Sequence, residues 1–154
     1  MKSMGISFFT GGFQYSILEK ADDNISFVER AKCTNPAPGR IRESSEWIYS
    51  TLEEISTRHT LKRIGFKLHY DLTTMKALYA HGAPVGVLGY FCAEKNIPLE
   101  GFTARKIKSY RFLNLPKKSQ TFDWLDSNHR DTGPYWDDNA RYSFAVAFRR
   151  ASEA

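Results

Sequence analysis

The chain has 154 residues, 42% hydrophobic and 14% aromatic, which supports one globular core and is too short for two ordinary domains. Charged residues make up 25%, which excludes wholesale disorder, and the longest apolar stretch, residues 83–93, falls short of the roughly 20 residues that a membrane span needs. The net charge of +5 does not by itself establish an acidic partner.

The first half of the chain predicts a hairpin, a third strand, a helix and a fourth strand. Gly11-Gly12 is a tight-turn signal between two apolar segments, so residues 1–20 read as a β-hairpin, and residues 25–33 form the next strand. From Arg40 to His59 apolar residues recur at helical spacing. Residues 61–68 then contain a buried strand centred on Gly65. We therefore expect a sheet that begins antiparallel.

The second half predicts crossover helices and one more strand. Residues 73–95 read as a helix rich in small residues, although Pro84 and three glycines are poor helix formers. Residues 96–102 form a turn and a strand, and Thr103 is a candidate N-cap for a basic helix. A short helix is expected over residues 122–125 and a final one over 136–150. The predicted fold is one α/β domain over residues 1–154, with a mixed five-stranded sheet flanked by helices.

The cysteines and the N-terminus bear on the compartment. Cys33 and Cys92 lack CxxC spacing, so neither a zinc site nor a disulfide framework is predicted. We find no signal peptide at the N-terminus. These features together predict a cytoplasmic protein that does not contact a membrane.

Positive charge is concentrated in one segment. Between residues 105 and 118 the chain has no acid but six cations, namely Arg105, Lys106, Lys108, Arg111, Lys117 and Lys118. Tyr110 and Phe112 are interleaved with them as stacking surfaces if the segment binds nucleic acid. A solvated helix face with its aromatic residues packed inward explains the same pattern. Five aspartates follow, at positions 123, 126, 131, 137 and 138.

The element order matches the ribonuclease H-like fold, and several segments resemble the RuvC-type Holliday-junction resolvases. Residues 5–19 (GISFFTGGFQYSILE) resemble the opening hairpin of that family, and residues 64–67 (IGFK) its fourth strand. Residues 82–88 (GAPVGVL) and 97–108 are similar to its small-residue helix and to its fifth strand with the basic helix. Residues 138–147 (DNARYSFAVA) resemble its closing helix.

The resemblance implies a catalytic site that this sequence does not complete. Such nucleases hold two divalent ions about 3.5–4 Å apart between carboxylates, the ligands that Mg²⁺ prefers. Carried over by position, the family's carboxylates fall here on Ser7, Lys67, Asp138 and Arg141. A formal charge of about −4 thereby becomes about +1. This pocket is expected to repel Mg²⁺ and to attract phosphate through Lys67 and Arg141.

The register of the last helix stays open by one residue. Aligning it on residues 145–147 moves the carboxylate pair to Asn139 and Tyr142, and the opposite shift gives Asp137 and Ala140. None of these registers provides the full set of carboxylates.

The sequence therefore predicts a catalytically degenerate RuvC-like protein that binds branched or duplex nucleic acid, expected to be DNA, without a cofactor and with a homodimer as its expected assembly. The candidate nucleic-acid ligands are basic residues, namely Lys67, Arg105, Lys106, Lys108, Arg111, Lys117, Lys118 and Arg141.

Two other functions are open. One is a nuclease with a rearranged site in which Asp71, Asp137 and Asp138 hold Mg²⁺ or Mn²⁺. The other is a protein-interaction module that keeps only the fold.

Structural roles compete for the same candidate residues. Lys67 and Arg141 would form a partly buried ion pair with Asp138. Asp137 would interact with the N-terminal dipole of the last helix, and Ser7 would satisfy a backbone group. His69 follows the strand of Lys67 and is a candidate general base, whereas the histidines show no spacing typical of metal ligands.

Overall fold

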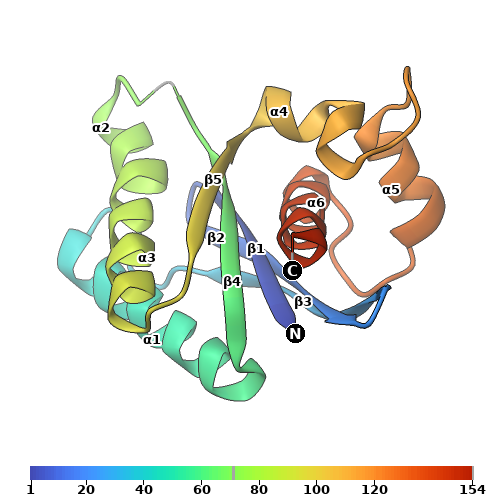
Figure 1. The fold of residues 1–154 in the computed structure, drawn as a ribbon. Coiled ribbons are helices and arrows are strands. Elements are labelled where there is room, and N and C mark those ends of the chain that lie inside the picture. The colour runs from blue at the N-terminus through green and yellow to red at the C-terminus, as the bar shows by residue number, and fades with distance from the viewer. Residues whose placement is uncertain (71, 154) are drawn as a thin grey trace.

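A mixed five-stranded sheet forms the centre of the computed structural model, which describes residues 1–70 and 72–153 (Figure 1). The strand order is β3-β2-β1-β4-β5. The first three strands pair antiparallel, whereas β4 pairs parallel with both β1 and β5. The strands are β1 (Lys2–Phe9), β2 (Gly12–Ala21), β3 (Asn24–Thr34), β4 (Leu61–Leu68) and β5 (Leu99–Thr103). The predicted fold class is confirmed.

Helices cover both faces of the sheet. In Figure 1, α1 (Ile41–His59) and α3 (Ala83–Glu94) lie on one face and α6 (Asp138–Ser152) on the other, with α5 (Thr121–His129) outside α6. The connection from β4 contains the short α2 (Met75–Ala77) and a π-helical turn, η1 (Leu78–Gly82). After β5 come α4 (Ala104–Lys108) and a 3-10 turn, η2 (Tyr110–Leu113). Within the described residues, none of the helices has the length and apolar character that crossing a bilayer requires.

Most predicted elements occur near their expected places, and the differences have local causes. The helix expected over residues 73–95 begins at Met75 and passes through η1 before Pro84, which occupies the first turn of α3, where proline is tolerated. The predicted cap is confirmed, since Thr103 accepts a hydrogen bond from the Lys106 amide. The short helix expected over residues 122–125 is longer, at Thr121–His129.

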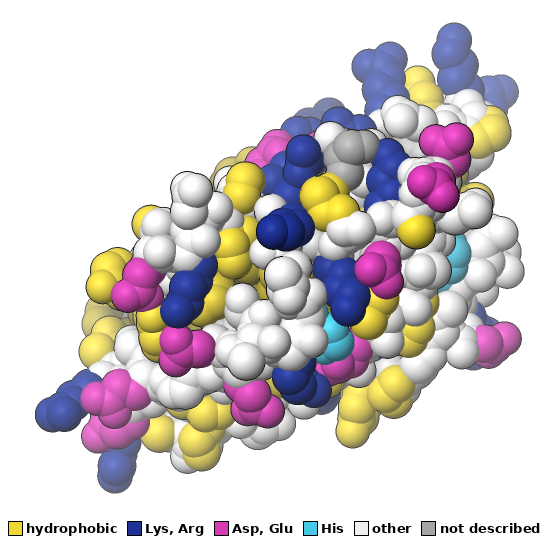
Figure 2. Space-filling view, turned by 60° about the horizontal axis from the view of Figure 1, so that its bottom comes forward, with side chains coloured by type: hydrophobic (Ala, Val, Ile, Leu, Met, Phe, Trp, Pro, Cys, Tyr) yellow, Lys and Arg dark blue, Asp and Glu magenta, His cyan; other side chains and the backbone are white. Residues whose placement is uncertain are grey.

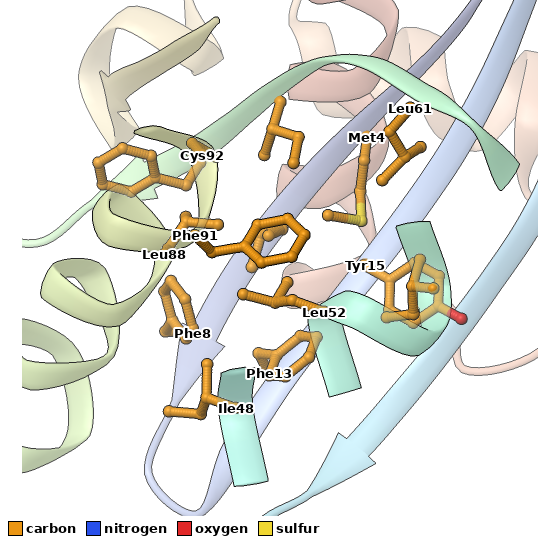
Figure 3. Packing of buried hydrophobic residues seen from close by; sticks show 14 of the residues in the cluster. Met4, Phe8, Phe13, Tyr15, Ile48, Leu52, Leu61, Leu88, Phe91 and Cys92 are labelled. Carbon is orange, nitrogen blue, oxygen red and sulfur yellow. The ribbon is translucent and has the colours of Figure 1, made fainter. Parts of the chain in front are cut away.

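Strand alternation gives the two faces of the sheet different chemistry. Met4, Ile6 and Phe8 of β1 are buried among side chains from α1 and α3, as Figure 3 shows for Met4 and Phe8. Ser3, just before Met4, and Ser7, between Ile6 and Phe8, are also fully buried but belong to the opposite face, because successive side chains in a strand alternate. The α1–α3 face is therefore a hydrophobic core, whereas the face beneath α6 combines these serines with a second hydrophobic cluster that includes Phe102, Phe144 and Val146.

Charge is mixed at one end of the molecule. Figure 2, turned so that the bottom of Figure 1 comes forward, shows Lys and Arg side chains interspersed with Asp and Glu rather than gathered by sign. The upper end in Figure 1, where β4 and β5 finish and α4 begins, contains the predicted site residue Lys67 and the start of the basic segment.

Candidate nucleic-acid interface

The candidate site lies where β1 and β4 end and α6 begins. Ser7 is fully buried near the end of β1, and its hydroxyl donates a 2.7 Å hydrogen bond to Oδ1 of Asn139 in the first turn of α6. The alternative that Ser7 satisfies a backbone group is therefore wrong. The Asn139 amide oxygen accepts this bond from the Ser7 hydroxyl. The Asn139 amide nitrogen therefore has N–H groups that can donate to a ligand.

Gly5 sets the register of α6. A Cβ at this position would overlap the Ser143 carbonyl oxygen and the Ala147 amide nitrogen, so only glycine permits so close an approach. Asn139, Ser143 and Ala147 lie four residues apart and therefore share one face of α6. Ser143 also exchanges a buried 2.9 Å hydrogen bond with Ser16. This stacking places Asn139 over Ser7.

The structure therefore selects the second register for the last helix and corrects the first. Asn139 and Tyr142, not Asp138 and Arg141, face Ser7 and Lys67. The sequence could not decide this, because the position of the helix depends on where its backbone reaches Gly5.

Two lysines gather over one aromatic ring at the end of β4. Lys67 Nζ lies 4.1 Å from the ring centroid of Tyr142, and Lys108 Nζ of α4 lies 5.8 Å from the same centroid. Burial and the charge of Lys108 lower the pKa of Lys67, while Asp138 acts in the opposite direction. Among the described residues neither Lys67 nor Lys108 forms an ion pair with an acid, although the charge of Asp138 acts on Lys67, so the site keeps positive charge that favours an anionic ligand.

Arg141 belongs to a separate ionic cluster. Its Nε and Nη2 lie 2.8 and 3.2 Å from the two carboxylate oxygens of Asp126, and its Nη1 lies 3.1 Å from Asp138. The hydrogen bond to Arg141 lowers the pKa of Asp126, whose carboxylate also accepts a 2.6 Å bond from Trp136 Nε1. Of the expected ion pair among Lys67, Arg141 and Asp138, only the Arg141–Asp138 part forms. Sequence reasoning missed Asp126, which lies fifteen residues before its partner in another helix.

Of the three aspartates proposed as metal ligands, the structure describes Asp137 and Asp138, and each of these two has another partner. Asp137 is the N-cap of α6, where its side chain accepts a 2.9 Å bond from the Ala140 amide, which confirms its structural role. The Asp138 side chain is 73% exposed and pairs with Arg141. Asp71 lies outside the described residues. Over residues 1–70 and 72–153, no three His, Cys, Asp or Glu side chains form a metal-ligating group.

The side chains at the site also do not fit a pair of hard divalent cations. Mg²⁺ prefers several carboxylate oxygens, whereas Ser7 and Asn139 supply neutral groups and Lys67 supplies an ammonium with no lone pair to donate. The lysine would instead repel a metal ion.

A stacked pair of histidines adjoins Lys67. His69 and His81 of η1 have ring centroids 3.8 Å apart and an interplanar angle of 19°. Burial and the charge of Lys67 lower the pKa of His69 to about 4, and the same causes lower that of His81. Both rings are therefore neutral near pH 7, and His69 as a general base stays a prediction. No sequence spacing indicated this contact, because the π-helical turn brings His81 to the sheet.

The basic segment divides between two environments. Lys108 joins Lys67 at the candidate site, whereas Arg105, Lys106 and Arg111 line a different pocket. Lys117 and Lys118 are exposed after η2. Phe112 is 3% exposed and packs against Phe102, so its proposed role as a stacking surface is wrong. Among the described residues, none of the aspartates that follow the segment forms an ion pair with its cations, and Asp126 pairs with Arg141 instead.

Comparison with solved structures identifies the fold. RuvC of Thermus thermophilus in complex with a Holliday junction substrate is similar with a TM-score of 0.75 and 12% identity, over 98% of this chain and 92% of that chain. The yeast mitochondrial Holliday junction resolvase Ydc2 gives 0.67 and 14%, over 98% and 78%. The fowlpox virus Holliday junction resolvase gives 0.63 and 9%, over 100% of each chain. The chain therefore has a RuvC-type resolvase fold.

Sequence comparison gives no further assignment, since no family model and no curated protein matches the chain.

Proposed function

We propose that this protein binds branched or duplex DNA through its basic surface and does not cleave it by metal-dependent hydrolysis. The observation that carries the proposal is the position of Lys67, whose ammonium lies over Tyr142 at the end of β4, where the resemblance calls for a metal-binding carboxylate. Its fold neighbours include resolvases solved in complex with Holliday junctions, which supports a junction as ligand.

The side chains at the site suit a phosphate group. Lys67 and Lys108 supply positive charge over Tyr142, and the Asn139 amide nitrogen supplies a neutral donor from the first turn of α6, three residues before Tyr142. Phosphate contacts of this kind provide affinity that falls with salt and carries little sequence information. The ligand preference would then come from the shape of the nucleic acid.

Substitution of Lys67 tests this function. We expect Lys67→Glu to weaken binding of a four-way junction at least tenfold in fluorescence anisotropy, because it replaces an attraction to phosphate with a repulsion. Lys67→Arg is the matched variant that keeps the charge, and it should retain most of the affinity. Equal affinities for the native chain and Lys67→Glu would overturn the role of this site, and cleavage with Mn²⁺ would favour an active resolvase instead.

We propose that the exposed apolar residues on the α1–α3 side form a homodimer contact. Met75 is 61% exposed and Tyr90 is 65% exposed, and the surface beside Tyr90 includes Tyr49 and Val87. Large exposed apolar patches mark interaction surfaces. Light scattering coupled to size exclusion should give twice the monomer mass for the native chain and the monomer mass for Tyr90→Glu. A native monomer at micromolar concentration would contradict the dimer.

We further propose that the protein acts in a reducing compartment such as the cytoplasm. Cys33 and Cys92 are both free thiols, and burial raises the pKa of each to about 11, so neither is an activated thiolate. Cell fractionation tests this compartment, and recovery of the protein from an oxidising compartment would contradict it.

A further inference from the structure

A second basic surface lies apart from the candidate site. A pocket of about 460 Å³ is lined by four cations, Arg105, Lys106, Arg111 and Arg149, together with the hydroxyl-bearing Thr103 and Ser109. These residues come from β5, α4, η2, the turn between them and the C-terminal half of α6. Arg149 lies 31 residues beyond Lys118, the end of the basic segment, so the sequence pattern did not connect it with the other three cations.

The fold separates this pocket from Lys67. On α4, Lys108 extends toward Phe122 and Tyr142, whereas Lys106 Nζ lies 4.9 Å from the ring centroid of Phe102 in β5. Arg149 lies near the C-terminus of α6, and Asn139 lies at its N-terminus. The pocket therefore meets α6 near its C-terminus and the candidate site meets it at its N-terminus, while α4 contributes side chains to both.

Neighbouring acids neutralise only part of the charge. Glu153 pairs with both Arg149 and Arg150, at 2.8 and 2.5 Å. Glu100 lies 3.0 Å from Arg150 and 4.0 Å from Lys106. Glu100 and Glu153 therefore neutralise the charge of three cations, Lys106, Arg149 and Arg150, only in part.

Two lining arginines have no such compensation. Arg111 contacts its neighbour Tyr110, donating from Nε to the phenol oxygen at 3.2 Å. Within the part of the chain that the structure describes, neither Arg105 nor Arg111 forms an ion pair with an acid. The pocket therefore keeps an excess of positive charge.

The polar groups around the pocket are arranged to donate. The Thr103 hydroxyl oxygen accepts from the Lys106 amide at 3.1 Å, and that of Ser109 accepts from the Arg111 amide at 3.4 Å. Each hydroxyl keeps its own proton for a ligand. Arg149 donates from Nε to Glu153 and from Nη1 to the Phe112 carbonyl oxygen at 3.4 Å. These bonds hold its guanidinium in place and leave Nη2 to donate to a ligand.

We propose that this pocket binds a phosphate group of the nucleic acid at a second position, away from Lys67. An excess of cations with hydroxyl donors suits the charge and the oxygen atoms of phosphate, and an arginine can bind two of those oxygens at once. Two phosphate positions, one near each end of α6, would fix the orientation of the DNA. This inference rests on the proposed function, since the phosphate belongs to a bound nucleic acid.

The salt dependence of binding tests the second position. We expect Arg105→Gln/Arg111→Gln to lower the slope of log K against log salt by about 0.9 for each phosphate that the variant no longer neutralises, and to weaken junction binding at physiological salt. The control Lys62→Gln/Lys95→Gln removes the same charge from exposed positions at the start of β4 and after α3, and it should leave the slope unchanged. Comparing junctions with and without 5′-phosphates separates internal phosphates from terminal ones.

The outcomes distinguish the two proposals. If the native chain binds the junction and the pocket variant keeps the native slope, the second phosphate position is overturned while the proposed function stands. An equal fall in slope in the control variant would also overturn the second phosphate position. If the native chain binds no nucleic acid, both proposals fail. Circular dichroism melts of both variants verify that a changed slope is not caused by unfolding.

Discussion

At the scale of single residues, Lys67 is expected to contribute to DNA binding without contributing to folding stability. Burial is the first cause of its lowered pKa, so folding disfavours its charged form and the charge is not there for stability. We expect Lys67→Met to keep or raise the free energy of unfolding in urea titrations while it weakens junction binding. A large loss of stability in Lys67→Met would instead indicate a structural role.

The partly buried histidines make stability depend on pH. The pKa of His69 falls from 6.5 to about 4 on folding, and those of His81 and His129 also fall, each chiefly through burial. Since the unfolded state binds protons more readily in this window, stability is fully present above about pH 6.5 and is lost as the pH falls toward 4. Urea midpoints at several pH values should show this loss, and His69→Gln should reduce it. A midpoint that does not change between pH 7 and pH 4.5 would contradict this prediction.

At the scale of elements, Gly5 holds α6 against the sheet. Gly5→Ala places a methyl group against backbone atoms of Ser143 and Ala147, which cannot rotate away, so we expect a loss of about 1–3 kcal/mol or more. Gly86→Ala is the matched control, because a Cβ there meets nothing within 4 Å in α3 and should be neutral or stabilising by up to about 1 kcal/mol. Thermal or urea unfolding measures both. Equal effects of the two substitutions would contradict the close packing of α6.

Periodic elements could be predicted from the sequence, whereas their register could not. The apolar segments on either side of Gly11-Gly12 predicted the opening hairpin, and Asp137 identified the start of α6. The one-residue choice between Asp138 and Asn139 depended on a backbone contact with Gly5, which no local pattern contains. The stacking of His69 on His81 likewise follows from a π-helical turn that sequence periodicity does not reveal.

At the scale of the whole molecule, the arrangement of charge was less predictable than its amount. The basic segment was visible in the sequence, yet the fold assigns Lys108 to one site and Arg105 with Arg111 to another. Arg141 was expected to contact phosphate, but Asp126 and Asp138 engage its guanidinium. Long-range pairing thus decides which cations are left for a ligand.

One experiment addresses the central proposal, which is that the protein binds a DNA junction through cations rather than through bound metal ions. A labelled four-way junction is incubated with the native chain in EDTA and in Mn²⁺, and bound and cleaved fractions are measured together. We predict equal binding in the two conditions and uncut strands in both. Cleavage that requires Mn²⁺ and disappears in Ser7→Ala or Asp138→Ala, or binding that requires the metal, would contradict this proposal.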